Sequence, residues 1–138
     1  MAGDLIHNYK VLPAINPVQT SAATAIVGAI IDRANYERVL FAIALGALTA
    51  TALTGTVLLE EGDDPALADA AAVADSDMVG ATPEVTAGFT QADDNVVKVL
   101  EYHGMRRYVR VTITPTSNNA AASLAVVAIL KGARYRPV

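Results

Sequence analysis

Apolar and polar residues alternate most clearly in the segment from Arg107 to Thr114. Val109, Val111 and Ile113 share one face, and the residues between them are polar or bear a hydroxyl group. A period of two is typical of a β-strand with one buried face. The segment therefore predicts a strand with one side in a core and the other toward water or a partner.

A second apolar run follows at 120–130. Pro115 is predicted to end the first strand because proline has no amide hydrogen for a ladder, and polar residues at 117–119 predict a turn. The two runs are therefore expected to form a hairpin. Both alternating sets of side chains in the second run are apolar, so we expect it to be covered on both faces or packed against another subunit.

The stretch from Val39 to Leu59 has no charged residue and is long enough to cross a bilayer as a helix. Gly46, Gly55 and several threonines divide it into two strand-length pieces, at 39–45 and 56–61. Two strands are the favoured interpretation. A membrane helix and a buried helix of a soluble protein remain alternatives.

Other segments fit the same pattern. Strands are predicted at 25–31, 85–91 and 96–103. The acidic segment at 62–80 predicts a loop with a helical turn and a short strand around Val73. A helix capped by Asp64 is its alternative. About seven to nine short strands favour an all-β fold, an antiparallel β-sandwich that is jelly-roll-like.

The beginning of the chain differs from the rest. Leu5 to Leu12 alternate, but Pro13, Pro17 and a run of small polar residues follow. This composition predicts an extended N-terminal arm or a first edge strand. We therefore expect an arm at 1–23 and a single sandwich domain at 24–138. The first ten residues lack the pattern of a secretory signal, so synthesis in the host cytoplasm is expected.

The composition limits the possible functions. Hydrophobic residues make up 53% of the chain and aromatic residues 5%, so small side chains that form poor ligand pockets dominate. A net charge of −4 argues against nonspecific binding of nucleic acid. The absence of cysteine excludes disulfides and thiolate chemistry, but it leaves the redox compartment open.

Few residues suggest catalysis or metal binding. His7 and His103 are far apart in sequence, and no serine lies in a GxSxG motif, so no enzyme activity and no cofactor are expected. The aspartates at 63–77 suggest calcium, but their spacing does not match an EF-hand. Solvated loop carboxylates are the favoured interpretation.

Basic residues gather near the end of the chain. They are Arg106, Arg107, Arg110, Lys131, Arg134 and Arg136. Without a phosphate-binding loop or an aromatic platform, nucleic acid is a poor partner for them. Pairing with acidic loops of a neighbouring subunit and simple solvation remain equally open.

Five short motifs occur in order along the chain. They are RANYERVLFAIALG (33–46), VLLEEGDD (57–64), VADSDMVG (73–80), EYHGMRRYVRVTIT (101–114) and AVVAILKGARYRPV (125–138). In their order and spacing the chain resembles small β-sandwich virion proteins of tailed phages and gene-transfer-agent particles, the head decoration or cement class. The resemblance implies a protein without catalysis that binds the outer surface of the head and stabilises the capsid.

The resemblance also implies particular partners. These are the major capsid protein or other virion subunits and further copies of the chain, without nucleic acid or membrane. A vertex spike base, a receptor- or carbohydrate-binding module and a small membrane protein are the alternatives. We expect the arm to bind partners through apolar burial and the tail through its arginines. The predicted interface residues are Leu5, Ile6, Tyr9, Val11, Leu12, Arg134, Tyr135 and Arg136.

Overall fold

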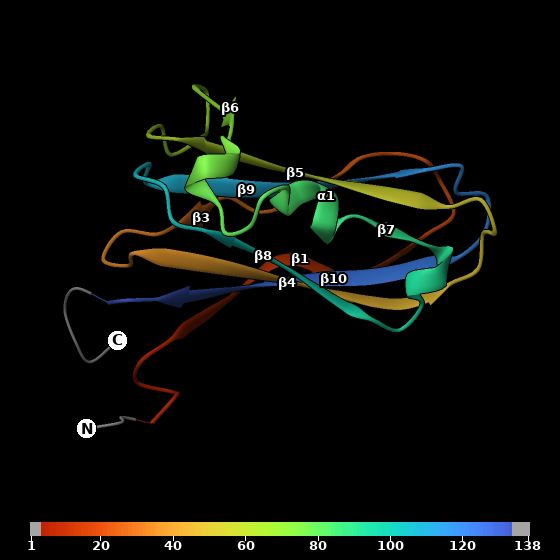
Figure 1. The fold of residues 1–138 in the computed structure, drawn as a ribbon, viewed down its shortest axis with the longest axis horizontal. Coiled ribbons are helices and arrows are strands. Elements are labelled where there is room, and N and C mark those ends of the chain that lie inside the picture. Colours follow the sequence, from red (N-terminus) through yellow and green to blue (C-terminus); the bar gives the residue numbers. More distant parts are fainter. Residues whose placement is uncertain (1–3, 134–138) are drawn as a thin grey trace.

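Two antiparallel sheets pack face to face in the computed structural model, which describes residues 4–133 (Figure 1). The strands are β1 (Lys10–Thr20), β2 (Ile26–Val27), β3 (Ile31–Asp32), β4 (Arg38–Leu48), β5 (Thr54–Gly62), β6 (Ala71–Ala72), β7 (Phe89–Thr90), β8 (Val97–Tyr102), β9 (Tyr108–Thr116) and β10 (Ala122–Lys131). The short helical segments are η1 (Asp75–Asp77), α1 (Pro83–Ala87) and η2 (Gln91–Asp93).

The order of the strands is that of a jelly roll. The four-stranded sheet has the order β1-β10-β4-β8. The other sheet has the order β2-β9-β5-β6, with β3 also pairing with β9 and β7 with β5. The long strands mostly alternate between the two sheets along the chain, so neighbours within a sheet are far apart in sequence. The predicted fold class, an all-β antiparallel sandwich that is jelly-roll-like, is confirmed.

The predicted hairpin between 107–114 and 120–130 is wrong. These segments form β9 and β10, which belong to different sheets. Between them, the buried Asn118 side chain donates hydrogen bonds to the carbonyl oxygens of Thr20 (3.2 Å) and Ala22 (3.1 Å). These bonds hold the loop between β9 and β10 against the end of β1, and the loop crosses there from one sheet to the other. A loop that crosses the sandwich and a hairpin turn use the same residue types.

Pro115 does not end its strand, because β9 continues to Thr116. Pro115 is aligned with Gly55 of β5 on one side of β9. On the other side, β2 pairs only with Thr112 and Ile113. Proline is tolerated in a strand where no neighbour needs its missing amide hydrogen.

The uncharged stretch from Val39 to Leu59 forms two strands, as the favoured interpretation predicted. They are β4 and β5, which lie in different sheets. The alternative of a helix through this stretch is therefore wrong. Within residues 4–133, no helix has the length and hydropathy needed to cross a membrane.

Two other predicted strands are interrupted. The run at 25–31 splits into β2 and β3 at Gly28, whose N–H donates to Val111 O (2.9 Å) while the N–H of Ala29 donates to Ala14 O (2.7 Å). The chain thereby links β9 to β1 across the open side of the sandwich. The run at 85–91 contains the end of α1 and only a short strand, β7. The acidic segment is a loop with β6 and η1, as expected.

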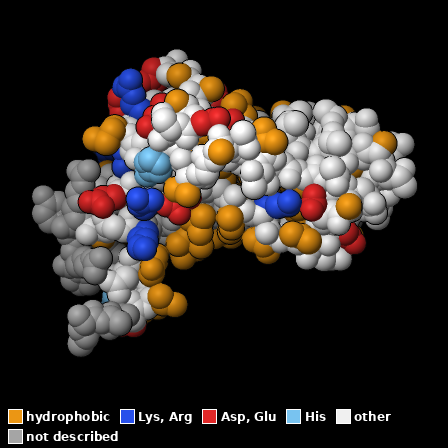
Figure 2. Space-filling model, in the orientation of Figure 1, with side chains coloured by type: hydrophobic (Ala, Val, Ile, Leu, Met, Phe, Trp, Pro, Cys, Tyr) orange, Lys and Arg blue, Asp and Glu red, His pale blue; other side chains and the backbone are white. Residues whose placement is uncertain are grey.

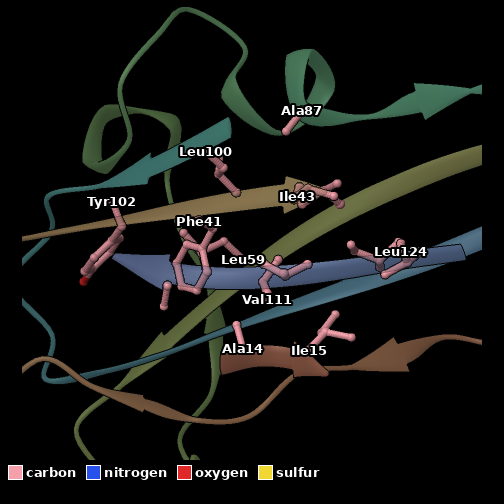
Figure 3. Close-up of a cluster of buried hydrophobic side chains, with 14 of the residues drawn as sticks. Ala14, Ile15, Phe41, Ile43, Leu59, Ala87, Leu100, Tyr102, Val111 and Leu124 are labelled. Carbon is pink, nitrogen blue, oxygen red and sulfur yellow. The ribbon is translucent and has the colours of Figure 1, made fainter. Parts of the chain in front are cut away.

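Most of the predicted N-terminal arm is extended and lies at an edge of the sandwich. Its residues Lys10–Thr20 form β1, which pairs with β10 through two register shifts. The core lies between the sheets (Figure 3), where Phe41, Leu59, Val111 and Val126 are fully buried. Ala87 of α1 closes the side of this core above Leu100 of β8. The domain boundary between 23 and 24 stays a prediction.

Candidate interaction surface

Most of the outer face of the four-stranded sheet is apolar, although Glu101 of β8 lies on it beside Leu40. Leu40 of β4 is aligned with Ile129 of β10, and Ile129 with Val11 of β1. The next row on this face consists of Val99, Ala42, Val127 and Pro13. We call this surface the apolar sheet face and define it by its residues. They are Val11, Pro13, Leu40, Ala42, Ala44, Val97, Val99, Ala125, Val127 and Ile129.

The exposed fractions show how unusual this face is for a surface in water. Val11 is 61% exposed, Val97 60% and Val99 56%. Figure 2 shows hydrophobic side chains gathered on the side of the molecule where this sheet lies and beside the N-terminal segment. A contiguous exposed apolar patch rimmed by polar groups is typical of a protein interaction site.

The outer face of the other sheet has a different character. Threonines from β5 and β9 occupy most of it, and Arg110 Nη2 lies 3.1 Å from Glu60 Oε1. Leu58, which is 41% exposed, is the largest apolar side chain among them. Only the four-stranded sheet therefore presents an aliphatic surface, because hydroxyl and charged groups on the other sheet are well solvated.

A cleft lies at one end of the apolar sheet face, where the chain before β1 bends away from the sheet. The Leu5 carbonyl oxygen accepts hydrogen bonds from the N–H groups of Asn8 and Tyr9, both 3.1 Å long, and these close a turn. The cleft between this turn and the sheet has a volume of about 1160 Å³. We call it the N-terminal cleft. It is lined by Leu5, Ile6, Tyr9, Lys10, Val11, Ala34, Asn35, Tyr36, Leu40 and Ile129.

The structure brings several predicted interface residues together at this cleft. Leu5, Ile6, Tyr9 and Val11 all line it, whereas Leu12 packs against the core from the inner side of β1. The predicted residues Arg134, Tyr135 and Arg136 lie outside the described residues. The assignment of all eight residues to a partner interface stays a prediction.

Sequence reasoning did not identify the rest of the surface. Val97, Val99, Ala42 and Ala44 belong to it because β8 and β4 lie beside β10, which the chain order does not reveal. One signal of this surface was present in the sequence. At 120–130 and at 39–45, the side chains on both faces of the predicted strand are apolar. A strand with two apolar faces needs a cover on each.

Charged groups border the cleft end of the surface. Arg38 Nη1 lies 2.5 Å from Glu101 Oε2 across β4 and β8. A smaller hollow here adjoins the N-terminal cleft and is lined by Tyr9, Arg38, Leu40, Glu101, Ile129 and Lys131. Because both hollows share Leu40 and Ile129, they form one continuous depression with a charged rim.

Three of the basic residues that gather near the end of the chain, Arg106, Arg107 and Arg110, form ion pairs within the chain. Arg106 Nη1 lies 2.5 Å from Asp63 Oδ2, and Arg107 Nη2 lies 2.9 Å from Asp32 Oδ2. Arg110 pairs with Glu60 as described above. The hydrogen bonds from Arg106 and Arg107 lower the pKa values of Asp63 and Asp32 below their ordinary values. These three arginines thus pair with carboxylates of β3, β5 and the acidic loop of the same chain, and the suggestion that they contact a neighbouring subunit stays a prediction.

The acidic loop uses its carboxylates to hold its own backbone. Asp69 accepts hydrogen bonds from the N–H groups of Asp63 (2.9 Å) and Asp64 (3.2 Å), and these bonds lower its pKa. Asp64 in turn accepts bonds from the N–H groups of Ala66 and Ala68. In the part of the chain that the structure describes, no group of three or more His, Asp or Glu side chains could hold a metal ion.

Comparisons with known proteins give relatives in structure and none in sequence. No protein-family model matches the chain, and no curated protein matches it. The PBSX exported protein XepA is similar to it with a TM-score of 0.58 and 15% identity, over 100% of this chain and 41% of XepA. The likeness shows the fold. The chain thus spans less than half the length of this structural neighbour.

Two further solved structures are more distant. The SPBc2 prophage-derived protein YomS has a TM-score of 0.49 and 9% identity, over 91% of this chain and 94% of YomS. The CBM32 module of AlyQ, solved in complex with 4,5-unsaturated mannuronic acid, has a TM-score of 0.38 and 12% identity, over 90% of this chain and 95% of that chain.

Proposed function

We propose that the protein is a non-enzymatic structural protein of a phage particle that binds the outside of the capsid and stabilises it. The observation that carries the proposal is the apolar sheet face, because an aliphatic surface across most of a sheet is costly in water and is stabilised by contact with protein. The ordered motifs in the sequence support the same assignment, and so does the fold shared with XepA, which is phage-derived.

The chemistry of the face fits a protein partner. The ten side chains that define the face are aliphatic, and the nearby Tyr9 and Tyr36 line the N-terminal cleft at its end. Burial of exposed valines contributes about 25 cal/mol for each Å² removed from water. A shell repeats the same site many times, so a subunit that touches several neighbours can be held by contacts that are weak individually.

Cosedimentation with purified heads of the phage that encodes the chain tests the proposal. We expect the wild-type chain to pellet with heads and to raise the temperature at which they release DNA. Replacing two exposed residues of the face, Val97→Lys with Val99→Lys, should abolish pelleting, because each ammonium group would be desolvated at the contact.

Val27→Lys is the matched control. Val27 is 59% exposed, almost as much as Val97, but it lies on β2 in the other sheet. Wild-type pelleting by this variant, with loss only in the face variant, supports the proposal. A wild-type chain that stays in the supernatant with every head preparation contradicts it, as does equal loss of binding in both variants.

A further inference from the structure

The N-terminal cleft is better suited to a segment of protein chain than to a small molecule. Its volume of about 1160 Å³ exceeds the range of about 300–1000 Å³ that is usual for small-ligand pockets. Among the described residues that line it, Lys10 alone is charged. Its floor consists of the aliphatic side chains of Leu40, Ile129 and Val11. A segment that matches this aliphatic floor would present neighbouring aliphatic side chains on an exposed turn.

The chain itself presents such a turn, in the outer wall of the same cleft. Leu5 is 74% exposed and Ile6 is 77% exposed. Hydrogen bonds from Asn8 and Tyr9 to the Leu5 carbonyl hold the turn together, so the two side chains project from an ordered ridge. The ridge and the floor are adjacent on one subunit. In a two-fold symmetric contact, each ridge can therefore enter the cleft of the other copy.

The charges near the cleft favour the same arrangement. Asp4, next to Leu5, is 59% exposed and lies 2.7 Å from the Nδ1 atom of His7. Basic side chains lie around the cleft that receives the ridge, with Lys10 in its lining and Lys131 in the adjoining hollow, where Arg38 is already paired with Glu101. Insertion of the ridge brings the Asp4 carboxylate of one copy to the basic side chains of the other. Opposite charges across a contact select the partner and its orientation.

We infer that two copies of this chain associate by mutual insertion of the Leu5–Ile6 ridge into the N-terminal cleft. The occupant of the cleft is thus a second copy of the chain. The contact leaves the β8 side of the apolar sheet face, with Val97 and Val99, open for another protein. The inference goes beyond the proposed function and does not depend on it.

Cysteine cross-linking tests the contact directly, because the chain has no cysteine of its own. A chain with Ile6→Cys is mixed with a chain that carries Ile129→Cys, and the mixture is oxidised. A disulfide between the two different chains can form only across copies. We expect this mixed dimer to be the main product. Met105→Cys in place of Ile129→Cys is the control, since Met105 is 86% exposed but does not line the cleft.

Sedimentation velocity gives a second, independent measure. The wild-type chain should sediment as a dimer and the variant Leu5→Asp with Ile6→Asp as a folded monomer, whereas Met105→Asp should remain a dimer. Asp4→Asn should weaken the dimer mainly at low salt. A wild-type chain that is monomeric at millimolar concentration overturns the inference, as does equal cross-linking of Ile6→Cys to the Ile129→Cys chain and to the Met105→Cys control.

The two proposals can fail separately. Val97→Lys with Val99→Lys should abolish binding to heads and leave the dimer intact. If the dimer is lost in this variant, the cleft is not the contact. If heads are not bound by a wild-type dimer, only the proposed function fails.

Discussion

The Tyr102 hydroxyl group donates a hydrogen bond of 2.7 Å to Glu61 Oε1, which joins β8 in one sheet to β5 in the other. The same hydroxyl accepts a bond of 3.1 Å from the N–H of Arg106. The guanidinium carbon of Arg33 lies 5.5 Å from the centroid of the Tyr102 ring. One phenol thus ties both sheets and the turn before β9 at the end of the core.

Removing the hydroxyl should lower stability without disturbing the packing of the ring. We expect Tyr102→Phe to reduce the free energy of unfolding by about 1 kcal/mol, because a hydrogen bond between the sheets is lost while Glu61 can still reach water. Urea unfolding measures the change. Glu61→Gln in the Tyr102→Phe background should cost less than it does in the wild type. Additive effects of the two substitutions would contradict the coupling.

The same tyrosine predicts sensitivity to alkali. Burial, followed by the hydrogen bond to Glu61, raises the pKa of Tyr102 above its ordinary value of 10.0. The folded state therefore holds the phenol proton more tightly than the unfolded state. This contribution to stability is complete below pH 10.0 and is lost as the pH rises above it. Urea midpoints measured from neutral to alkaline pH should fall less in Tyr102→Phe than in the wild type, and parallel curves would contradict the prediction.

Asp32 predicts a weaker effect in acid. Arg107 Nε and Nη2 donate hydrogen bonds to its two carboxylate oxygens, and each bond is 2.9 Å long. These bonds lower the pKa of Asp32 below its ordinary value of 3.8. This stabilisation is present above pH 3.8 and is lost as the pH falls through the folded-state pKa. Both side chains are about half exposed, so Asp32→Asn should cost only about 0.2–1 kcal/mol at neutral pH.

Acid titration of thermal stability measures this difference. The stability difference between the wild type and Asp32→Asn should shrink at low pH, when the wild-type carboxylate is protonated. It should also shrink in molar salt, which screens exposed charges. A difference that stays constant at low pH and in high salt would show that the ion pair with Arg107 is not its cause.

Gly55 leaves room for an aromatic ring. A Cβ atom at this position of β5 would overlap the ring of Phe89, which is 3% exposed. We expect Gly55→Ala to lower the free energy of unfolding by about 1–3 kcal/mol through overpacking. In a Phe89→Ala background the added methyl group should cost little, and a double-mutant cycle in urea measures this. An unchanged penalty in that background would locate the strain in the backbone.

Two neighbours on β8 separate the core from the apolar sheet face. Leu100 is 2% exposed and Val99 is 56% exposed. Leu100→Ala should cost about 2–5 kcal/mol because it opens a cavity in the core. Val99→Ala should change stability by less than about 0.5 kcal/mol, since its side chain already contacts water. Comparable losses in urea unfolding would show that a partner subunit covers Val99 under the conditions of the measurement.

The sequence predicted the strands with long, regular patterns. Val109, Val111 and Ile113 alternate with polar residues, and β9 buries these three side chains. The uncharged stretch at 39–59 was resolved into β4 and β5 because Gly46, Gly55 and the threonines interrupt it. The bounds of the shorter elements were wrong, since the runs at 25–31 and 85–91 were predicted as whole strands, whereas two-residue strands such as β2 and β7 have too few positions to show a period.

The sequence by itself thus determined the all-β class and which face of β9 is buried, because alternation is a local property of the chain. Only the tertiary structure decided which strands pair. The inward residues of β9 would be the same beside β10 as beside β5, so alternation cannot choose between a hairpin and a jelly roll. For the same reason, only the fold placed Leu5 and Ile6 opposite Leu40 and Ile129. The cleft between them exists because β1 pairs with β10 across almost the whole length of the chain.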